Sequence, residues 1–132
     1  MLESKLLILL AVIGGTIAIA AAIKYRSHTK ASNAAPEYTR AGLPTLIYFW
    51  SPTCAECRSS QSRIVDAVSS EADGFEVVRV NVHDAPEKAK AFGIFTVPTT
   101  VVLDSGGKVH AINTGGVDQA TLRSQIDAVI EA

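Results

Sequence analysis

The segment FWSPTCAECRSSQ, residues 49–61, holds the only two cysteines of this 132-residue chain, Cys54 and Cys57. The apolar, β-favouring run PTLIYFW precedes it over residues 44–50, and apolar residues recur along one helical face after it. The sequence therefore predicts a buried strand, a short turn and a helix that runs from Cys54 to about residue 70. Two cysteines one helical turn apart lie on the same side of a helix, where a disulfide is possible.

Composition excludes nucleic-acid binding and two structural roles for the thiols. The net charge is −1, with acids and bases mixed along the chain, so no basic surface favours nucleic acid. Two cysteines cannot form a disulfide framework, and one pair supplies only half of a four-ligand zinc site. The two thiols therefore need another explanation.

The segments that follow alternate between strand and helix patterns. The order of strand, helix, strand, helix, strand, strand and helix predicts an α/β fold with a mixed sheet of about four strands and helices on both faces. DAPE, with Asp84 and Glu87, has the form of a capping box for the second helix, and Gly93 is a suitable end for it. The later elements are expected at residues 75–82 (strand), 84–93 (helix), 99–113 (two strands around a glycine turn) and 118–132 (helix).

The N-terminal part of the chain is unusually apolar. Residues 6–23 carry no charge, and as a helix with a rise of ~1.5 Å per residue they extend ~27 Å, close to the ~30 Å of a bilayer core. This length favours a transmembrane helix. A buried core helix rarely lacks polar positions over five turns. A cleaved signal peptide is the other alternative: Ala18-Ile19-Ala20 suits cleavage, but Lys5 beside Glu3 makes a weak basic start.

The flanking charges predict the topology. Lys24, Arg26 and Lys30 follow the apolar run, whereas Lys5 is the only basic residue before it. The positive-inside rule then places the C-terminal part in the cytoplasm, with an extracytoplasmic domain as the alternative. Residues 24–42 are polar and contain a proline, which predicts a tether. The globular domain is expected over residues 43–132.

FWSPTCAEC, VRVNV, FGIFTVPTT and TGG, in this order, resemble the thioredoxin superfamily. The resemblance covers about residue 43 to the end. The combination of Trp50, the cysteine pair and the later Val97-Pro98-Thr99 is specific to this superfamily. It implies a thioredoxin-like fold. The family usually has a further strand and helix before the strand that leads to its cysteines. The short segment between residues 23 and 43 favours a minimal four-stranded form.

Position and resemblance together predict the roles of the site residues. A helix N-terminus stabilises a thiolate, so Cys54 is expected to attack a substrate disulfide and Cys57 to resolve the mixed disulfide. The resemblance implies that Pro98 is cis and faces the cysteines, that the backbone of Val97 pairs with the substrate, and that Trp50 packs beside the motif. It implies no cofactor beyond the Cys54–Cys57 disulfide, and no metal.

Two neighbours of the thiols are expected to modulate their pKa values. Thr53 and Glu56 have the capping-box form S/T-x-x-E, with Thr53 as the cap. The carboxylate and the Cys54 thiolate then share one positive helix end, so Glu56 should raise the pKa of Cys54.

Tyr48 stands where the family commonly has a buried aspartate that helps to deprotonate the resolving thiol. With a reference pKa of ~10 it is a poor base. Arg79 takes the place of a family lysine whose usual partner would be that aspartate. The histidines are expected at the solvated surface: His28, His83 and His110.

These patterns predict a membrane-tethered thiol–disulfide oxidoreductase that reduces protein disulfides. For a cytoplasmic domain, the family implies electrons from NADPH through a thioredoxin reductase. An outward-facing domain would need a membrane thiol carrier or would act as an oxidant. The alternative is a non-catalytic thioredoxin-fold module that binds a partner, or carries copper or zinc, through the cysteine pair.

Overall fold

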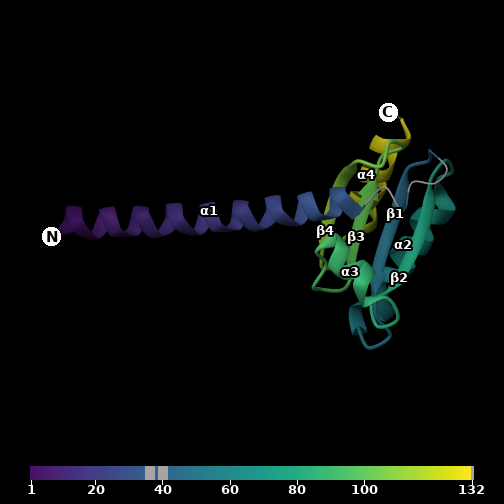
Figure 1. Ribbon diagram of the computed structural model, residues 1–132, viewed down its shortest axis with the longest axis horizontal. Coiled ribbons are helices and arrows are strands. Elements are labelled where there is room, and N and C mark those ends of the chain that lie inside the picture. Colours follow the sequence, from purple (N-terminus) through teal and green to yellow (C-terminus); the bar gives the residue numbers. More distant parts are fainter. Residues whose placement is uncertain (35–37, 39–41, 132) are drawn as a thin grey trace.

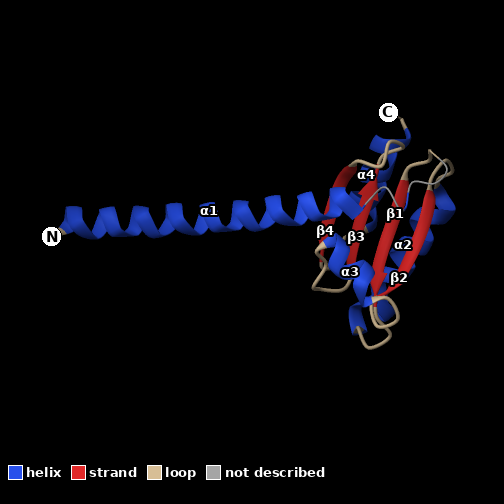
Figure 2. Ribbon diagram, in the orientation of Figure 1, coloured by secondary structure: helices blue, strands red, loops and turns tan. Residues whose placement is uncertain are grey.

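The computed structural model describes residues 1–34, 38 and 42–131 (Figure 1). A long N-terminal helix, α1, projects from a compact body of four strands and the remaining helices (Figure 2). The elements are α1 (Leu2–Ala34), β1 (Thr45–Trp50), a π-helical turn η2 (Cys57–Gln61), α2 (Ser62–Glu71), β2 (Glu76–Asn81), α3 (Pro86–Phe92), β3 (Thr99–Leu103), β4 (Val109–Thr114) and α4 (Gln119–Ile130).

The four strands form one mixed sheet in the order β2-β1-β3-β4. Strand β1 pairs in parallel with β2 and antiparallel with β3, and β3 pairs antiparallel with β4. The parallel pair is joined through α2 and the antiparallel pair β3–β4 by a tight turn, as such connections require. The predicted fold class, strand number and element order are confirmed.

Strand β1 separates two apolar layers because its side chains alternate between the two faces of the sheet. Leu46 and Tyr48 pack beneath α2 and α4, whereas Ile47 and Phe49 pack beneath α3 and the end of α1. All four side chains are fully buried. This double burial explains why the run reads as continuously apolar instead of alternating.

The end of α1 differs from the predicted tether. Residues 24–34 continue the helix, and the buried Ala31 joins the apolar layer that contains Phe92. The stem of Lys30 lies 3.2 Å from the position that a Cβ on Gly93 would take. No proline or glycine lies between Ile23 and Ala34, so the local sequence permits the helix to continue. The rest of the expected tether lies largely outside the described residues.

The apolar part of α1 makes no core. Leu6, Ile13 and Ile23 are exposed, and none of its most apolar stretch is buried. Within Leu2–Ala31 the helix is long and apolar enough to cross a membrane, judged by length and composition. Its exposure argues against the core-helix alternative.

Helix α3 begins differently from the prediction. Ala85 is its N-cap and makes no side-chain cap bond, and Pro86 occupies the first turn. The carbonyl of Asn81 accepts the N–H groups of Asp84 and Ala85, which closes a turn before the helix. The expected Asp84 cap is therefore wrong, because Asp84 belongs to that turn and a proline suits the first helical position. Gly93 ends the helix with φ of 71°, as predicted.

Candidate active site

The two cysteines are joined by a disulfide at the start of the helix that follows β1, with their Cα atoms 5.3 Å apart. The carbonyl of Cys54 accepts the N–H of Arg58 at 3.2 Å, and the Cys54 Sγ accepts the N–H of Cys57, also at 3.2 Å. Cys54 is therefore the N-cap residue, with its sulfur aimed at the free N–H groups of the helix. Cys54 is half-buried, whereas Cys57 is 1% exposed.

The capping box expected at Thr53 is not formed. The hydroxyl of Thr53 pairs with that of Ser51 at 3.1 Å, and Cys54 takes the cap position itself. This shift of one residue places Glu56 at the second helical position, where its side chain cannot close the box. The Glu56 carboxylate instead lies against Gly116, and a Cβ at Gly116 would overlap it. Glycine at that position therefore makes room for Glu56.

The first turns of this helix include a π-helical segment that the sequence pattern does not predict. Residues 57–61 form the π-helical turn η2, and its last residue, Gln61, is buried. The amide of Gln61 accepts the N–H of Val117 at 2.9 Å and donates to the Val117 carbonyl at 3.4 Å. These two bonds tie the cysteine-bearing helix to the loop before α4. Gln61 is thus a supporting residue that sequence reasoning missed, since a glutamine on a helix is ordinarily solvated.

The predicted cis peptide bond between Val97 and Pro98 is confirmed. The carbonyl oxygen of Val97 lies 3.7 Å from the Cys54 Sγ, and the carbonyl of Pro98 accepts the N–H of Gly115 at 2.8 Å. Three segments distant in sequence, which carry Cys54, Val97-Pro98 and Gly115, therefore meet at one edge of the domain. Trp50, at the end of β1, is partly buried and packs with the layer beneath α2 and α4.

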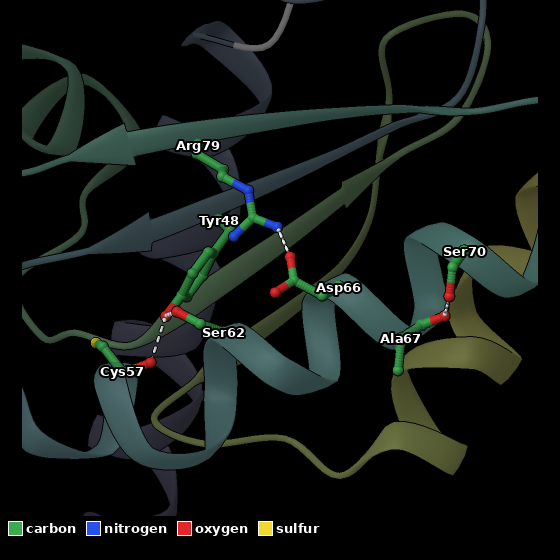
Figure 3. A network of polar contacts seen from close by, with 7 residues as sticks. All are labelled: Tyr48, Cys57, Ser62, Asp66, Ala67, Ser70 and Arg79. Carbon is green, nitrogen blue, oxygen red and sulfur yellow. Dashed lines mark hydrogen bonds and ion pairs between the residues drawn. The ribbon is translucent and has the colours of Figure 1, made fainter.

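Tyr48 lies behind Cys57 in a small polar network (Figure 3). Its hydroxyl donates to the Cys57 carbonyl at 3.4 Å and pairs with the Ser62 hydroxyl at 3.3 Å. Burial raises the pKa of Tyr48 above its ordinary value of 10.0, and the Ser62 hydrogen bond and the charge of Arg79 oppose this shift only in part. The phenol therefore stays neutral at physiological pH.

Arg79 has a partner that the sequence did not suggest. Its guanidinium forms an ion pair with Asp66 of α2 and lies 5.8 Å above the ring of Tyr48 (Figure 3). The aspartate that the family would offer at position 48 is absent, as expected, and Asp66 of α2 is the carboxylate partner of Arg79 instead. Both side chains are exposed, and a surface pair of this kind adds little stability.

The cysteine pair is the candidate ligand set for a metal ion in this domain. Among the described residues, no group of three or more His, Cys, Asp or Glu side chains is placed to hold a metal ion. Thiolates bind soft metals, but two ligands leave a structural zinc site half complete.

Comparisons with known proteins agree with this geometry. The thioredoxin family model matches residues 29–128. Thioredoxin of Porphyra purpurea is 37% identical over 89 residues, which cover 67% of this chain and 81% of that protein. Thioredoxin 1 of Synechococcus elongatus is 30% identical over 91 residues, covering 69% and 84%. A mutant thioredoxin from Halobacterium salinarum NRC-1 shares the fold, with a TM-score of 0.62 at 24% identity over 67% of this chain and 76% of that one.

The matched region begins within α1, so it includes the end of that helix, which packs on α3. It also contains the cysteine pair, the cis proline and the Gly115 loop that meets it. Sequence similarity and site geometry thus lead to the same conclusion: the chain belongs to the thioredoxin family of redox proteins, which are thiol–disulfide oxidoreductases.

Proposed function

We propose that this protein is a membrane-tethered oxidoreductase that reduces disulfides of other proteins. The observation that carries the proposal is the asymmetry of the cysteine pair. Cys54 is half-buried, caps a helix and lies next to the Val97 carbonyl, whereas Cys57 is enclosed. An accessible sulfur at a helix N-terminus suits the attacking thiolate, and an enclosed sulfur suits the resolving one.

The reaction proceeds in two exchanges. The Cys54 thiolate attacks one sulfur of the substrate disulfide, which forms a mixed disulfide and releases the other substrate sulfur as a thiolate. The Cys57 thiolate then attacks the Cys54 sulfur, forms the Cys54–Cys57 disulfide and releases the second substrate thiolate. The dithiol thus supplies two electrons. The backbone of Val97, whose carbonyl lies beside the Cys54 sulfur, pairs with the extended substrate segment, and Trp50 flanks it.

The second exchange lacks the carboxylate base that the resemblance leads one to expect. Tyr48 stands at that position and is neutral, so it cannot take the Cys57 proton at physiological pH. The Cys57 thiol must lose its proton to solvent or to the departing substrate thiolate. This arrangement supports slower or more specialised exchange than a buried carboxylate would give.

The anchor is residues 6–23, and the basic residues after it support a cytoplasmic domain. Electrons then come from NADPH through a thioredoxin reductase. A cleaved signal sequence, or an outward-facing domain supplied by a membrane thiol carrier, is the alternative for this segment.

Coupled turnover tests the function. The reduced full chain, supplied with NADPH and a thioredoxin reductase, should oxidise NADPH continuously while it reduces a protein disulfide such as those of insulin. Retention of Cu(I) or Zn(II) at one ion per chain, with no turnover under these conditions, would instead support the carrier alternative.

The topology predicts the result of thiol labelling in cells. In Cys57→Ala, Cys54 is the only remaining thiol, so labelling reports the position of the domain alone. A membrane-impermeant maleimide, added with an impermeant reductant, should label this variant only after the cells are permeabilised. Labelling of intact cells would place the domain outside and would replace the thioredoxin reductase by a membrane carrier.

Glu56→Gln is expected to lower the pKa of Cys54 and to make the pair more oxidising. Both side chains lie in the first turn of the same helix, so a carboxylate there disfavours the thiolate. The expected effect is about 0.3–1 kcal/mol, as for a charge at an exposed helix end. Thiolate absorbance near 240 nm against pH, with a glutathione redox titration, measures it.

Asp73→Asn is the matched control for Glu56→Gln, because it removes a carboxylate beyond the far end of α2. It should leave the pKa of Cys54 unchanged. An unchanged or raised Cys54 pKa in Glu56→Gln would show that the carboxylate against Gly116 has no part in the redox poise.

A further inference from the structure

A groove of about 820 Å³ separates α1 from the edge strand β4, which lie side by side where α1 reaches the domain (Figure 1). Four residues of α1 and four of β4 line it, among them Ala20, Ile23, Lys24, His28 and His110. None of the cysteine-motif residues is among them. Strand β4 ends at Thr114, and the next residue, Gly115, bonds to Pro98 of the active site. The groove therefore runs beside the catalytic edge without being part of it.

The chemistry of the walls changes along α1. Ala20 and Ile23 belong to the apolar run, whereas Lys24 and His28 follow it on the polar part of the helix. His110 adds a third nitrogen base from the β4 side. Among the described residues that line the groove, none is acidic. Such a site suits a ligand with an anionic head and an apolar tail.

A β-bulge places His110 at this groove. In the ladder with β3, Val102 pairs with Ala111 and Leu103 pairs with Val109, so His110 is the extra residue of β4. Val109 consequently packs into the core, and His110 stays exposed beside α1. Without the bulge, His110 would stand opposite Leu103, a fully buried core residue. Bulges on edge strands commonly redirect a side chain in this way.

We propose that this groove binds the headgroup of an anionic phospholipid, with Lys24, His28 and His110 around its phosphate and an acyl chain along Ala20 and Ile23. The proposal rests on the membrane anchor proposed above. If residues 6–23 span the bilayer core, Lys24 lies at headgroup depth and His28 one helical turn, ~6 Å, beyond it. The lipid phosphate then meets the Lys24 ammonium and the His28 imidazole at the same level.

A bound lipid would orient the domain on the membrane. The end of α1 is fixed to the body by the packing of Ala31 against the layer that contains Phe92. A headgroup between α1 and β4 would hold the β4 edge against the bilayer surface. The loops at the end of β4, which include the Gly115–Pro98 contact, would then face substrates close to the membrane.

Native mass spectrometry of the full chain, released from nanodiscs of equal parts phosphatidylglycerol and phosphatidylcholine, tests the site. The wild-type chain should retain about tenfold or more phosphatidylglycerol relative to phosphatidylcholine. Lys24→Gln/His28→Gln/His110→Gln should lose this preference. The control, His83→Gln/Lys88→Gln/Lys108→Gln, removes one histidine and two lysines outside the groove, so it removes more positive charge than the groove variant and should still keep the preference.

Alkaline carbonate extraction, read separately, reports whether α1 is inserted. Extraction of the chain would remove the anchor and the lipid site with it. An inserted chain with no lipid preference, or a groove variant that behaves like its control, would overturn the lipid site alone. Displacement of phosphatidylglycerol by millimolar inorganic phosphate would show that a soluble anion is the ligand, and would also overturn it.

Discussion

Cys54→Ser should reduce the rate of insulin disulfide reduction by about three orders of magnitude or more, to the uncatalysed background. A serine hydroxyl at the helix N-terminus stays protonated and cannot form a disulfide with the substrate, so the first exchange is lost. Cys57→Ser should instead permit the first exchange and block the second. That variant is expected to accumulate mixed disulfides through Cys54, visible by non-reducing electrophoresis and mass spectrometry.

Ser59→Ala, an exposed hydroxyl in the same π-helical turn, is the control and should retain the wild-type rate. Limited alkylation of the reduced protein with iodoacetamide at neutral pH provides an independent assignment. Because Cys54 is half-buried and Cys57 is enclosed, the label should appear first on Cys54. Preferential labelling of Cys57, or mixed disulfides in the Cys54 variant, would reverse the two roles.

Phe92→Ala is expected to lower the free energy of unfolding by about 3–5 kcal/mol. The Phe92 ring is fully buried, with its centroid 5.3 Å from that of Tyr38 and 5.4 Å from that of Phe49. It belongs to the layer that receives Ala31 of α1. The truncation would leave a cavity among residues from three elements, and denaturant unfolding followed by Trp50 fluorescence measures the loss.

Phe95→Ala provides a matched control a few residues along the chain. Its ring is 82% exposed and lies beneath the ammonium of Lys30 at 5.9 Å. The same truncation at this surface position should change stability by no more than about 0.5–1 kcal/mol. Equal losses in the two variants would show that the layer between α1, α3 and β1 does not form as described.

Much of the fold follows from local patterns in the sequence. The run at residues 44–50 predicts a buried strand because residues on both faces of a central strand are apolar. Gly93 ends helix α3 because the residue after the helix has a positive φ, which glycine adopts more readily than other residues. The cysteine spacing places both thiols on one side of a helix start, where the structure has them bonded. The cis bond at Pro98 required the resemblance in addition, since most X-Pro bonds are trans.

The sequence predicts one part of the N-terminal helix, and tertiary contacts determine the other. Its apolar run and the charges after it are sequence properties, and they predict a helix long enough to span a membrane. Its extension to Ala34 depends on the burial of Ala31 among residues of α3 and β1. A polar stretch near a proline reads as a linker when that distant apolar surface is unknown.

The details of the active site depended on contacts that no local pattern encodes. The sequence alone determined which two residues form the redox pair, Cys54 and Cys57, and the order of the helices and strands. Tertiary structure decided that Cys54 caps its own helix, that Glu56 lies against Gly116, and that Gln61 holds the backbone of Val117. The physical reason is that a cap changes with a shift of one residue, and that the partners of buried polar groups lie far along the chain, so only the folded backbone determines which groups meet.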